Sequence, residues 1–174
     1  MRDPQVKWWV LGGSLVVLLP LLGCGGLFAA LKWSEFSCRR DVENARTTVR
    51  TDTKPIRAEL APLGVPAEVH WVLEPDRHCE MLPTPGTDRD SQSGVVKLDP
   101  AQAEVLVGRY AGWEAARPGG SGLLSPYIPS GGTWQRTDEL DAQFVGAHSG
   151  EEARYYVNVD NGAVLFSSYA DHAG

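Results

Sequence analysis

The sequence predicts an α+β protein, in which an N-terminal transmembrane helix precedes a small domain with two helices packed on an antiparallel sheet. Three observations lead to this prediction. Residues 10–31 carry no charged side chain, residues 38–63 place apolar side chains at helical spacing, and residues 133–169 contain short strand-like segments between turn residues. Strands joined by short turns pair antiparallel, so helices are expected on one side of the sheet. We divide the chain into an N-terminal membrane anchor, residues 1–33, and an extracytoplasmic α+β domain, residues 34–174.

The uncharged segment 10–31 is long enough to cross a lipid bilayer. As a helix it would measure about 33 Å, against a hydrocarbon core of about 30 Å. Trp8, Trp9 and Trp33 flank it, at the positions where indole rings favour the membrane–water boundary. We therefore expect an uncleaved signal anchor that spans the membrane once.

The same segment permits a second interpretation. Leu21, Leu22, Gly23 and Cys24 form a tetrapeptide that resembles the bacterial lipobox. The resemblance implies that Cys24 is acylated and that residues 1–23 are removed, which would make the protein a lipoprotein. The apolar run continues to Leu31, however, beyond the 7 to 15 residues or so of a cleavable signal, and this length favours the uncleaved helix.

Small residues inside the anchor offer a contact between two copies of the chain. Gly25 and Ala29, and likewise Gly26 and Ala30, are four residues apart and would allow two transmembrane helices to approach closely. This spacing is common in apolar helices. A weak homodimer through the transmembrane helix is therefore only a secondary expectation.

Cysteine usage indicates the compartment of the domain. Apart from Cys24, the chain contains only Cys38 and Cys79, an even pair that is typical of an oxidising compartment. No Cys-x-x-Cys motif is present, so we predict a structural disulfide between Cys38 and Cys79. This places the N-terminus in the cytoplasm and the domain outside it. The twelve arginines against four lysines are typical of a GC-rich bacterial genome, which points to the bacterial cell envelope.

The charge of the domain excludes one class of partner. Residues 34–174 carry 13 basic and 21 acidic side chains, a net charge of −8. Binding to nucleic acid requires a basic face that displaces counterions from phosphates, so no nucleic-acid partner is expected. Residues 35–57 are locally basic, with six basic and four acidic side chains. This is more typical of a solvated helix face than of a lipid-headgroup contact.

The first half of the domain is predicted to contain one long helix and two strands. Cys38, Val42, Ala45, Val49, Ile56, Leu60 and Leu63 form one helical stripe. We expect a helix from Trp33 to about Pro62, kinked or briefly broken at Pro55. Its stripe is expected to pack on the protein's own sheet rather than on a second copy as a coiled coil. Residues 67–74 alternate between apolar and polar, as in a half-buried strand. Residues 82–94 are predicted to form an exposed loop and residues 95–98 a short strand.

The second half is predicted to begin with a helix and to end in strands. Asp99 and Pro100 form a good helix start, and the helix is expected to reach about Ala116. A Gly- and Pro-rich connection, residues 119–132, follows. Strands are expected at residues 133–136, 142–147, 153–159 and 163–169. Asn161 and Gly162 predict a type I′ turn that sets Val159 opposite Val164, and Val157 opposite Phe166.

No motif for catalysis, cofactor binding or metal binding stands out. The histidines are scattered, the serines of the Gly-rich segments fit neither a nucleophile elbow nor a phosphate loop, and Cys79 has an obvious disulfide partner. We therefore predict no catalytic residue, no cofactor and no metal ligand. The candidate ligand surface is a group of aromatic residues near the Gly- and Pro-rich connection, Trp113, Tyr127 and Trp134, although such residues more often anchor a core.

Together these observations favour a membrane-anchored, non-enzymatic binding or accessory module of the bacterial cell envelope, whose partner is an envelope protein or a glycan. Two alternatives remain at this point. One is a lipoprotein acylated at Cys24 that serves as a substrate or subunit of a larger complex. The other is an envelope-associated hydrolase whose active-site residues are dispersed in the sequence.

Overall fold

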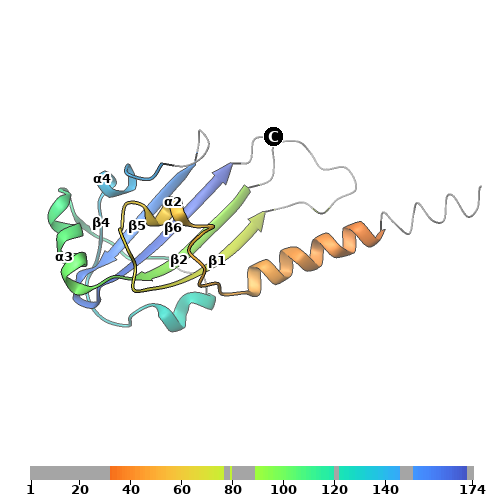
Figure 1. Cartoon of the computed structure of the whole chain (residues 1–174), viewed down its shortest axis with the longest axis horizontal. Coiled ribbons are helices and arrows are strands. Elements are labelled where there is room, and N and C mark those ends of the chain that lie inside the picture. The colour runs from red at the N-terminus through yellow and green to blue at the C-terminus, as the bar shows by residue number, and fades with distance from the viewer. Residues whose placement is uncertain (1–31, 77–78, 80–88, 120–121, 146–150, 172–174) are drawn as a thin grey trace, which may run out of the picture. The chain divides into compact units, whose positions relative to one another are not determined.

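The computed structural model describes residues 32–76, 79, 89–119, 122–145 and 151–171 (Figure 1). These residues fall into two compact units: residues 32–40 with Cys79, and the described residues from 41 onwards without Cys79. The predicted span, residues 10–31, and Cys24 lie outside the described residues. Among the residues that are described, no helix is both long enough and apolar enough to cross a membrane.

A helix covers residues 32–47, and its residues 32–40 belong to the first unit. Near its start, Glu35 accepts hydrogen bonds from Lys32 at 2.8 Å and from Arg39 at 2.6 Å. Cys38 and Cys79 form a disulfide with a Cα–Cα distance of 5.8 Å. The predicted pairing of these two cysteines is therefore confirmed.

This helix ends at residue 47, so the predicted continuous helix is wrong over residues 48–56, and residues 57–60 form a separate helix inside the predicted range. The hydroxyl groups of Thr47 and Thr48 donate to the carbonyls of Glu43 and Asn44 in the last turn. Beyond it, Arg50 forms an isolated antiparallel bridge with Trp71, with N···O distances of 2.8 and 2.9 Å. Backbone pairing with a strand at this point is incompatible with a continuing helix.

The second unit is built on a six-stranded antiparallel sheet with the order β1-β2-β6-β5-β4-β3. The strands are β1 (Glu68–Asp76), β2 (Arg89–Lys97), β3 (Glu114–Ala115), β4 (Trp134–Arg136), β5 (Glu152–Asn158) and β6 (Ala163–Asp171). The predicted α+β class with an antiparallel sheet is confirmed.

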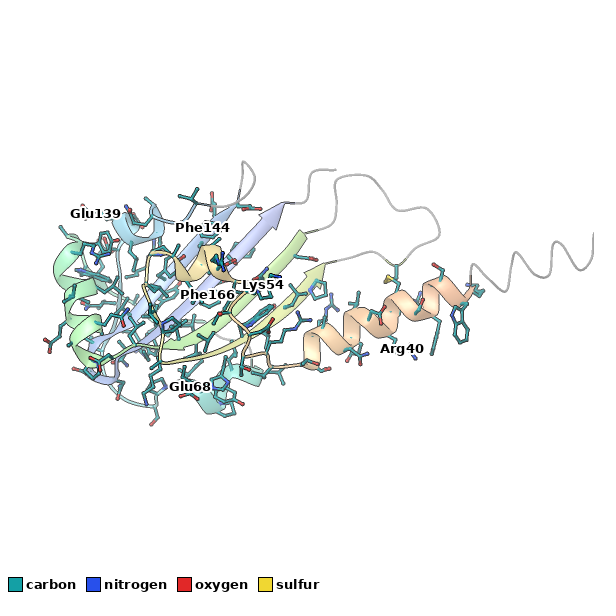
Figure 2. All side chains as sticks on the ribbon, in the orientation of Figure 1. Arg40, Lys54, Glu68, Glu139, Phe144 and Phe166 are labelled. Carbon is teal, nitrogen blue, oxygen red and sulfur yellow. A yellow bond between two sulfur atoms is a disulfide. The ribbon has the colours of Figure 1, made fainter. Side chains whose placement is uncertain are left out.

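The two faces of the sheet are covered differently. We call the first the core face: it packs against α2 (Arg57–Leu60), α3 (Pro100–Arg109) and α4 (Asp138–Asp141) through Ile56, Leu60, Leu63, Ala103, Leu106 and Leu140. We call the second the η1 face: here Leu124, from the 3₁₀ helix η1 (Gly122–Tyr127), packs on Val72, Val95 and Leu165. Phe166 lies on the side of α2, and Glu68 lies beside η1 (Figure 2). Among the described residues, three short helices thus pack on the core face, where two helices were predicted.

Strand β2 is longer than predicted. Residues 89–94, predicted as part of an exposed loop, are strand, and only residues 82–88 of that predicted loop lie outside the described residues. β2 is paired on both sides, by β1 and by β6. Two hydrogen-bonded ladders outweigh the weak strand propensity of Asp90, Ser91 and Ser93, because β propensity depends strongly on context.

The predicted start of α3 is confirmed, but its predicted end is wrong. The Asp99 side chain accepts a hydrogen bond from the backbone N–H of Ala101 at 3.0 Å, as expected for an N-cap residue. The helix ends at Arg109 rather than at Ala116. The indole N–H of Trp113 donates to the carbonyls of Val107 and Tyr110, both at 3.0 Å, which satisfies backbone acceptors that a longer helix would have used.

Two predictions for the C-terminal strands also need correction. Residues 142–145 form no strand and instead follow α4, whose N-cap is Thr137, while residues 146–150 lie outside the described residues. The final hairpin closes through the 3₁₀ turn η2 (Val159–Asn161) and Gly162, which adopts a φ of 62°. Val157 therefore lies opposite Val164, a shift of two residues from the predicted register. A shift of two keeps every side chain on its predicted face.

Candidate functional site

Two pockets open on the η1 face. We call the first the histidine pocket; it has a volume of about 390 Å³ and is lined by Glu68, His70, Val95, Lys97, Pro126, Tyr127, Pro129, Asn161 and Ala163. We call the second the serine pocket; it has a volume of about 350 Å³ and is lined by Glu74, Ser91, Ser93, Gly119, Arg154, Tyr156, Ser167 and Tyr169. Both have volumes within the range of small-molecule sites.

The histidine pocket is organised around a stacked pair of rings. The His70 ring lies parallel to the Tyr127 ring, with 3.7 Å between centroids and an angle of 15° between the planes. The Nε2 atom of His70 is 2.7 Å from a carboxylate oxygen of Glu68, the residue two positions earlier on β1. The hydrogen bond and the charge of His70 both hold the pKa of Glu68 below its ordinary value. The ring is thereby fixed in one orientation.

This arrangement suits binding better than catalysis. The Nδ1 atom of His70 is buried and has no hydrogen-bond partner among the described residues, and Nε2 is already taken by Glu68. A general base must reach the proton that it abstracts, and neither ring nitrogen is free at the pocket surface. The lining contains no serine, threonine or cysteine. The described residues of this pocket therefore supply no pair of a hydroxyl or thiol nucleophile of the serine, threonine or cysteine type with a histidine base.

The serine pocket depends on the register of four adjacent strands. Side chains alternate between the two faces of a sheet, so every second residue of each strand reaches the η1 face. Ser93 of β2 lies opposite Ser167 of β6, which lies opposite Arg154 of β5. In the next row on the same face, Ser91 of β2 lies between Glu74 of β1 and Tyr169 of β6. Segments that are distant in the sequence thus supply one polar surface.

The side chains of the serine pocket differ in exposure. Tyr169 is 49% exposed, and Arg154 and Glu74 are exposed at opposite margins of the pocket, on β5 and β1. Tyr156 is partly buried because it packs against the cluster that contains Leu124 and Leu165. The pocket thus combines charged groups at its margins, an aromatic ring open to solvent and hydroxyl groups on its floor.

A third pocket, of about 380 Å³, lies around α4 and β5 and is lined by Arg136, Asp138, Asp141, Ala142, Phe144, Glu151, Glu152, Ala153 and Arg154. Arg136 pairs with both Asp138 and Asp141. Burial raises the pKa of Asp141, which also accepts a hydrogen bond from the backbone N–H of Tyr155 at 2.8 Å. Arg136, Asp138 and Asp141 satisfy one another, so we assign these three side chains a structural role. Arg154 lies on the border that this pocket shares with the serine pocket.

The predicted aromatic surface is divided by the sheet. Trp113 packs against the cluster on the core face, and its indole N–H is used at the end of α3. Trp134 packs against the cluster on the η1 face. Of the three predicted residues, Tyr127 alone lines one of the pockets described above, where it stacks on His70. The structure therefore does not bring the three residues together.

Sequence reasoning missed most of the residues that line the two pockets. The alternation of Glu68, His70 and Glu74 with apolar neighbours placed them on one face of a strand, but it did not indicate what they face. No signal linked them to Arg154 or Ser167. In the described part of the chain, no group of three or more His, Cys, Asp or Glu residues is placed to hold a metal ion.

No protein family, curated protein or solved structure matches this chain. Functional conclusions therefore rest on the site itself.

Proposed function

We propose that this chain is a membrane-anchored, extracytoplasmic binding module of the bacterial cell envelope that holds its ligand on the η1 face and catalyses no reaction. One observation carries the proposal: two pockets of about 390 and 350 Å³ open on the same sheet face and are lined by polar and aromatic side chains. Pockets with a few convergent polar groups are the usual form of ligand sites.

The start of the helix over residues 32–47 supports the membrane anchor. Trp33 is 71% exposed and Phe36 is 58% exposed, and their ring centroids are 6.4 Å apart. The guanidinium of Arg40 lies 6.0 Å from the centroid of the Phe36 ring. Exposed aromatic rings next to basic side chains favour the interface between membrane and water. This surface directly follows the predicted span.

The disulfide supports the proposal that the domain lies outside the cytoplasm. Disulfides persist in oxidising environments and are rare in the cytosol, so the Cys38–Cys79 bond favours a domain outside the cytoplasm. Acylation at Cys24 stays the alternative form of the anchor. A hydrolase is supported less well, because the lining of the histidine pocket has no serine, threonine or cysteine next to its histidine.

The anchor is tested with the full-length protein in membranes. A single-pass anchor predicts the mass of the intact chain, resistance to carbonate extraction, and digestion of the domain by protease added to the extracytoplasmic side only. Loss of residues 1–23 together with a lipid adduct on Cys24 would identify the lipoprotein instead. Digestion from the cytoplasmic side would overturn the proposed compartment.

The binding function is tested by titrating the full-length protein in lipid nanodiscs with size-fractionated fragments of envelope polymers. We expect at least one fraction to change the NMR signals of η1-face residues such as Tyr127 and Tyr169, while those of core-face residues such as Leu106 stay unchanged. The fragments should be recovered intact. Cleavage of a fragment, or saturating binding that leaves the η1 face unperturbed, would contradict the proposal.

A further inference from the structure

We infer that the serine pocket binds a saccharide that carries a carboxylate group. Arg154 holds the carboxylate, the serine hydroxyls bind sugar hydroxyls, and Tyr169 packs on a sugar ring. This inference rests on the proposed binding function and names the class of ligand at one of its two pockets.

The composition of the serine pocket selects a polar ligand. Seven of its eight lining residues have a hydrogen-bonding or charged side chain, and the eighth is Gly119. The histidine pocket, by contrast, includes the apolar residues Val95, Pro126, Pro129 and Ala163. The Ser91 hydroxyl donates to the carbonyl of Glu74 at 3.3 Å. An apolar ligand would bury the hydroxyls of Ser93 and Ser167 without partners, at a cost of about 1 to 3 kcal/mol for each buried group. A ligand with many hydroxyl groups avoids this cost.

The serines present hydroxyls in a row that fits such a ligand. Ser93 and Ser167 are neighbours on β2 and β6, and Arg154 continues the row on β5. Adjacent strands are about 4.8 Å apart, so the row extends roughly 10 Å between the backbones of Ser93 and Arg154. A serine hydroxyl can both donate and accept a hydrogen bond, as can a sugar hydroxyl. The row therefore matches a polyhydroxylated ligand laid across the strands.

The charges at the margins select an acidic group and orient it. Within the described residues, Arg154 forms no ion pair, and its guanidinium is exposed beside the pocket. A guanidinium binds a carboxylate through two parallel hydrogen bonds. Glu74 of β1 and the exposed Glu152 of β5 lie at the two ends of the neighbouring row, which also holds Ser91 and Tyr169, and they repel a carboxylate there. The acidic group of a ligand is thus directed to the row that holds Ser93, Ser167 and Arg154.

Tyr169 supplies the platform for a ring. Its side chain is 49% exposed, although it lies in the middle of the sheet on β6. A tyrosine presents an apolar face and a polar hydroxyl, which suits a sugar ring that has C–H groups on one face and hydroxyls at its edge. A peptide strand would dock at a sheet edge, through backbone hydrogen bonds, rather than on a face. A saccharide is therefore favoured over an acidic peptide.

The inference is tested with three probes on the full-length protein in nanodiscs of phosphatidylcholine, by isothermal titration calorimetry at low salt. The probes are a galacturonic acid hexamer, a neutral cellohexaose and a hexaglutamate peptide. We expect the acidic saccharide to bind about tenfold or more tightly than either of the others, because it alone uses both the guanidinium and the hydroxyl row.

Variants then assign the contacts. Arg154→Gln should lower the affinity for the acidic saccharide about tenfold and leave the affinity for the neutral saccharide unchanged. Arg109→Gln, the same loss of charge on α3, which packs on the core face, is the matched control and should change neither affinity. Tyr169→Ala should lower the affinity for both saccharides, whereas Tyr169→Phe should keep both affinities unchanged. Circular dichroism and the unfolding midpoint of each variant verify the fold.

Each other outcome overturns the inference. Equal affinity for the acidic and neutral saccharides shows that Arg154 does not bind the carboxylate. An equal loss of affinity in Arg109→Gln shows attraction by overall charge. Binding of hexaglutamate as tight as that of the acidic saccharide shows a carboxylate or peptide site instead. If none of the three probes binds, this ligand class is rejected. The titration with envelope fragments then decides separately whether the proposed binding function stands.

Discussion

Gly94 shows how one residue permits the packing of the core face. It lies on β2 between Trp71 of β1 and Phe166 of β6, in a single row across three strands. Trp71 and Phe166 are almost fully buried. A Cβ atom at residue 94 would lie 2.6 Å from the Phe166 Cζ atom and 2.9 Å from the Trp71 Cβ atom. The absence of a side chain at Gly94 is what allows both aromatic residues to cover the middle of the sheet.

Gly94→Ala should therefore destabilise the protein. Overpacking of a dense core costs about 1 to 3 kcal/mol, because neighbouring side chains are forced from their preferred rotamers. The measurement is the free energy of unfolding in urea. Gly108→Ala is the matched control: residue 108 is in α3, and apart from its chain neighbours and the backbone of its own helix no atom lies within 4 Å of its added Cβ. Replacing glycine in a helix should stabilise by about 0.5 to 1 kcal/mol. Destabilisation of similar size in both variants would contradict this account.

At the scale of elements, the sequence predicted best where a local interaction sets the boundary. The start of α3 depends on Asp99 and Pro100, which are adjacent in the chain. The end of α3 depends on Trp113, which reaches back to two carbonyls, and the length of β2 depends on its two neighbouring strands. Those boundaries are set by tertiary contacts, which no local pattern contains.

The candidate site was beyond prediction for the same reason. Ser91 and Ser93 fall in a segment whose composition predicts a loop, and Arg154 and Ser167 come from the C-terminal hairpin. Only the pairing of β2 with β6 brings these residues together. The pocket is a product of sheet order, and sheet order was not predicted from the sequence. The disulfide, in contrast, was predictable because the domain offers only two cysteines.

The disulfide is the element-scale feature whose removal is most informative. Cys38 and Cys79 are separated by 41 residues. Opening a loop of that size should lower the free energy of unfolding by about 4 kcal/mol, because the unfolded chain gains conformational freedom. The double variant Cys38→Ser, Cys79→Ser measures this loss in urea.

Cys24→Ser is the matched control for the disulfide, because it removes a cysteine outside the bond. It should leave the free energy of unfolding unchanged, whichever form the anchor takes. In non-reducing denaturant, the unmodified protein should not react with a maleimide at Cys38 or Cys79. Free reaction at both residues, or unchanged stability of the double variant, would show that the bond does not stabilise the fold.

At the scale of the whole molecule, carboxyl groups act on stability in opposite directions as pH changes. Hydrogen bonds and positive charges hold the pKa of Glu35 and of Glu68 below the ordinary value of 4.5. Their contribution is present at neutral pH and is lost as pH falls through the lowered pKa values. Burial raises the pKa of Asp141 above 3.8, so the folded state favours its protonated form. Its contribution is greatest below pH 3.8 and is lost as pH rises through the raised pKa.

The variant Asp141→Asn isolates the contribution of Asp141 to the pH dependence of stability, because Glu35 and Glu68 are present in both the variant and the unmodified protein. Relative to the variant, the unmodified protein should be most stable at pH values below 3.8 and should lose this relative stability as pH rises through the raised pKa of Asp141. Above that pKa the difference should become constant. Urea unfolding of both proteins across this pH range measures it. A difference that grows in favour of the unmodified protein with rising pH would mean that the ion pair with Arg136, at 3.3 Å, and the hydrogen bond from Tyr155 outweigh the burial of the carboxylate.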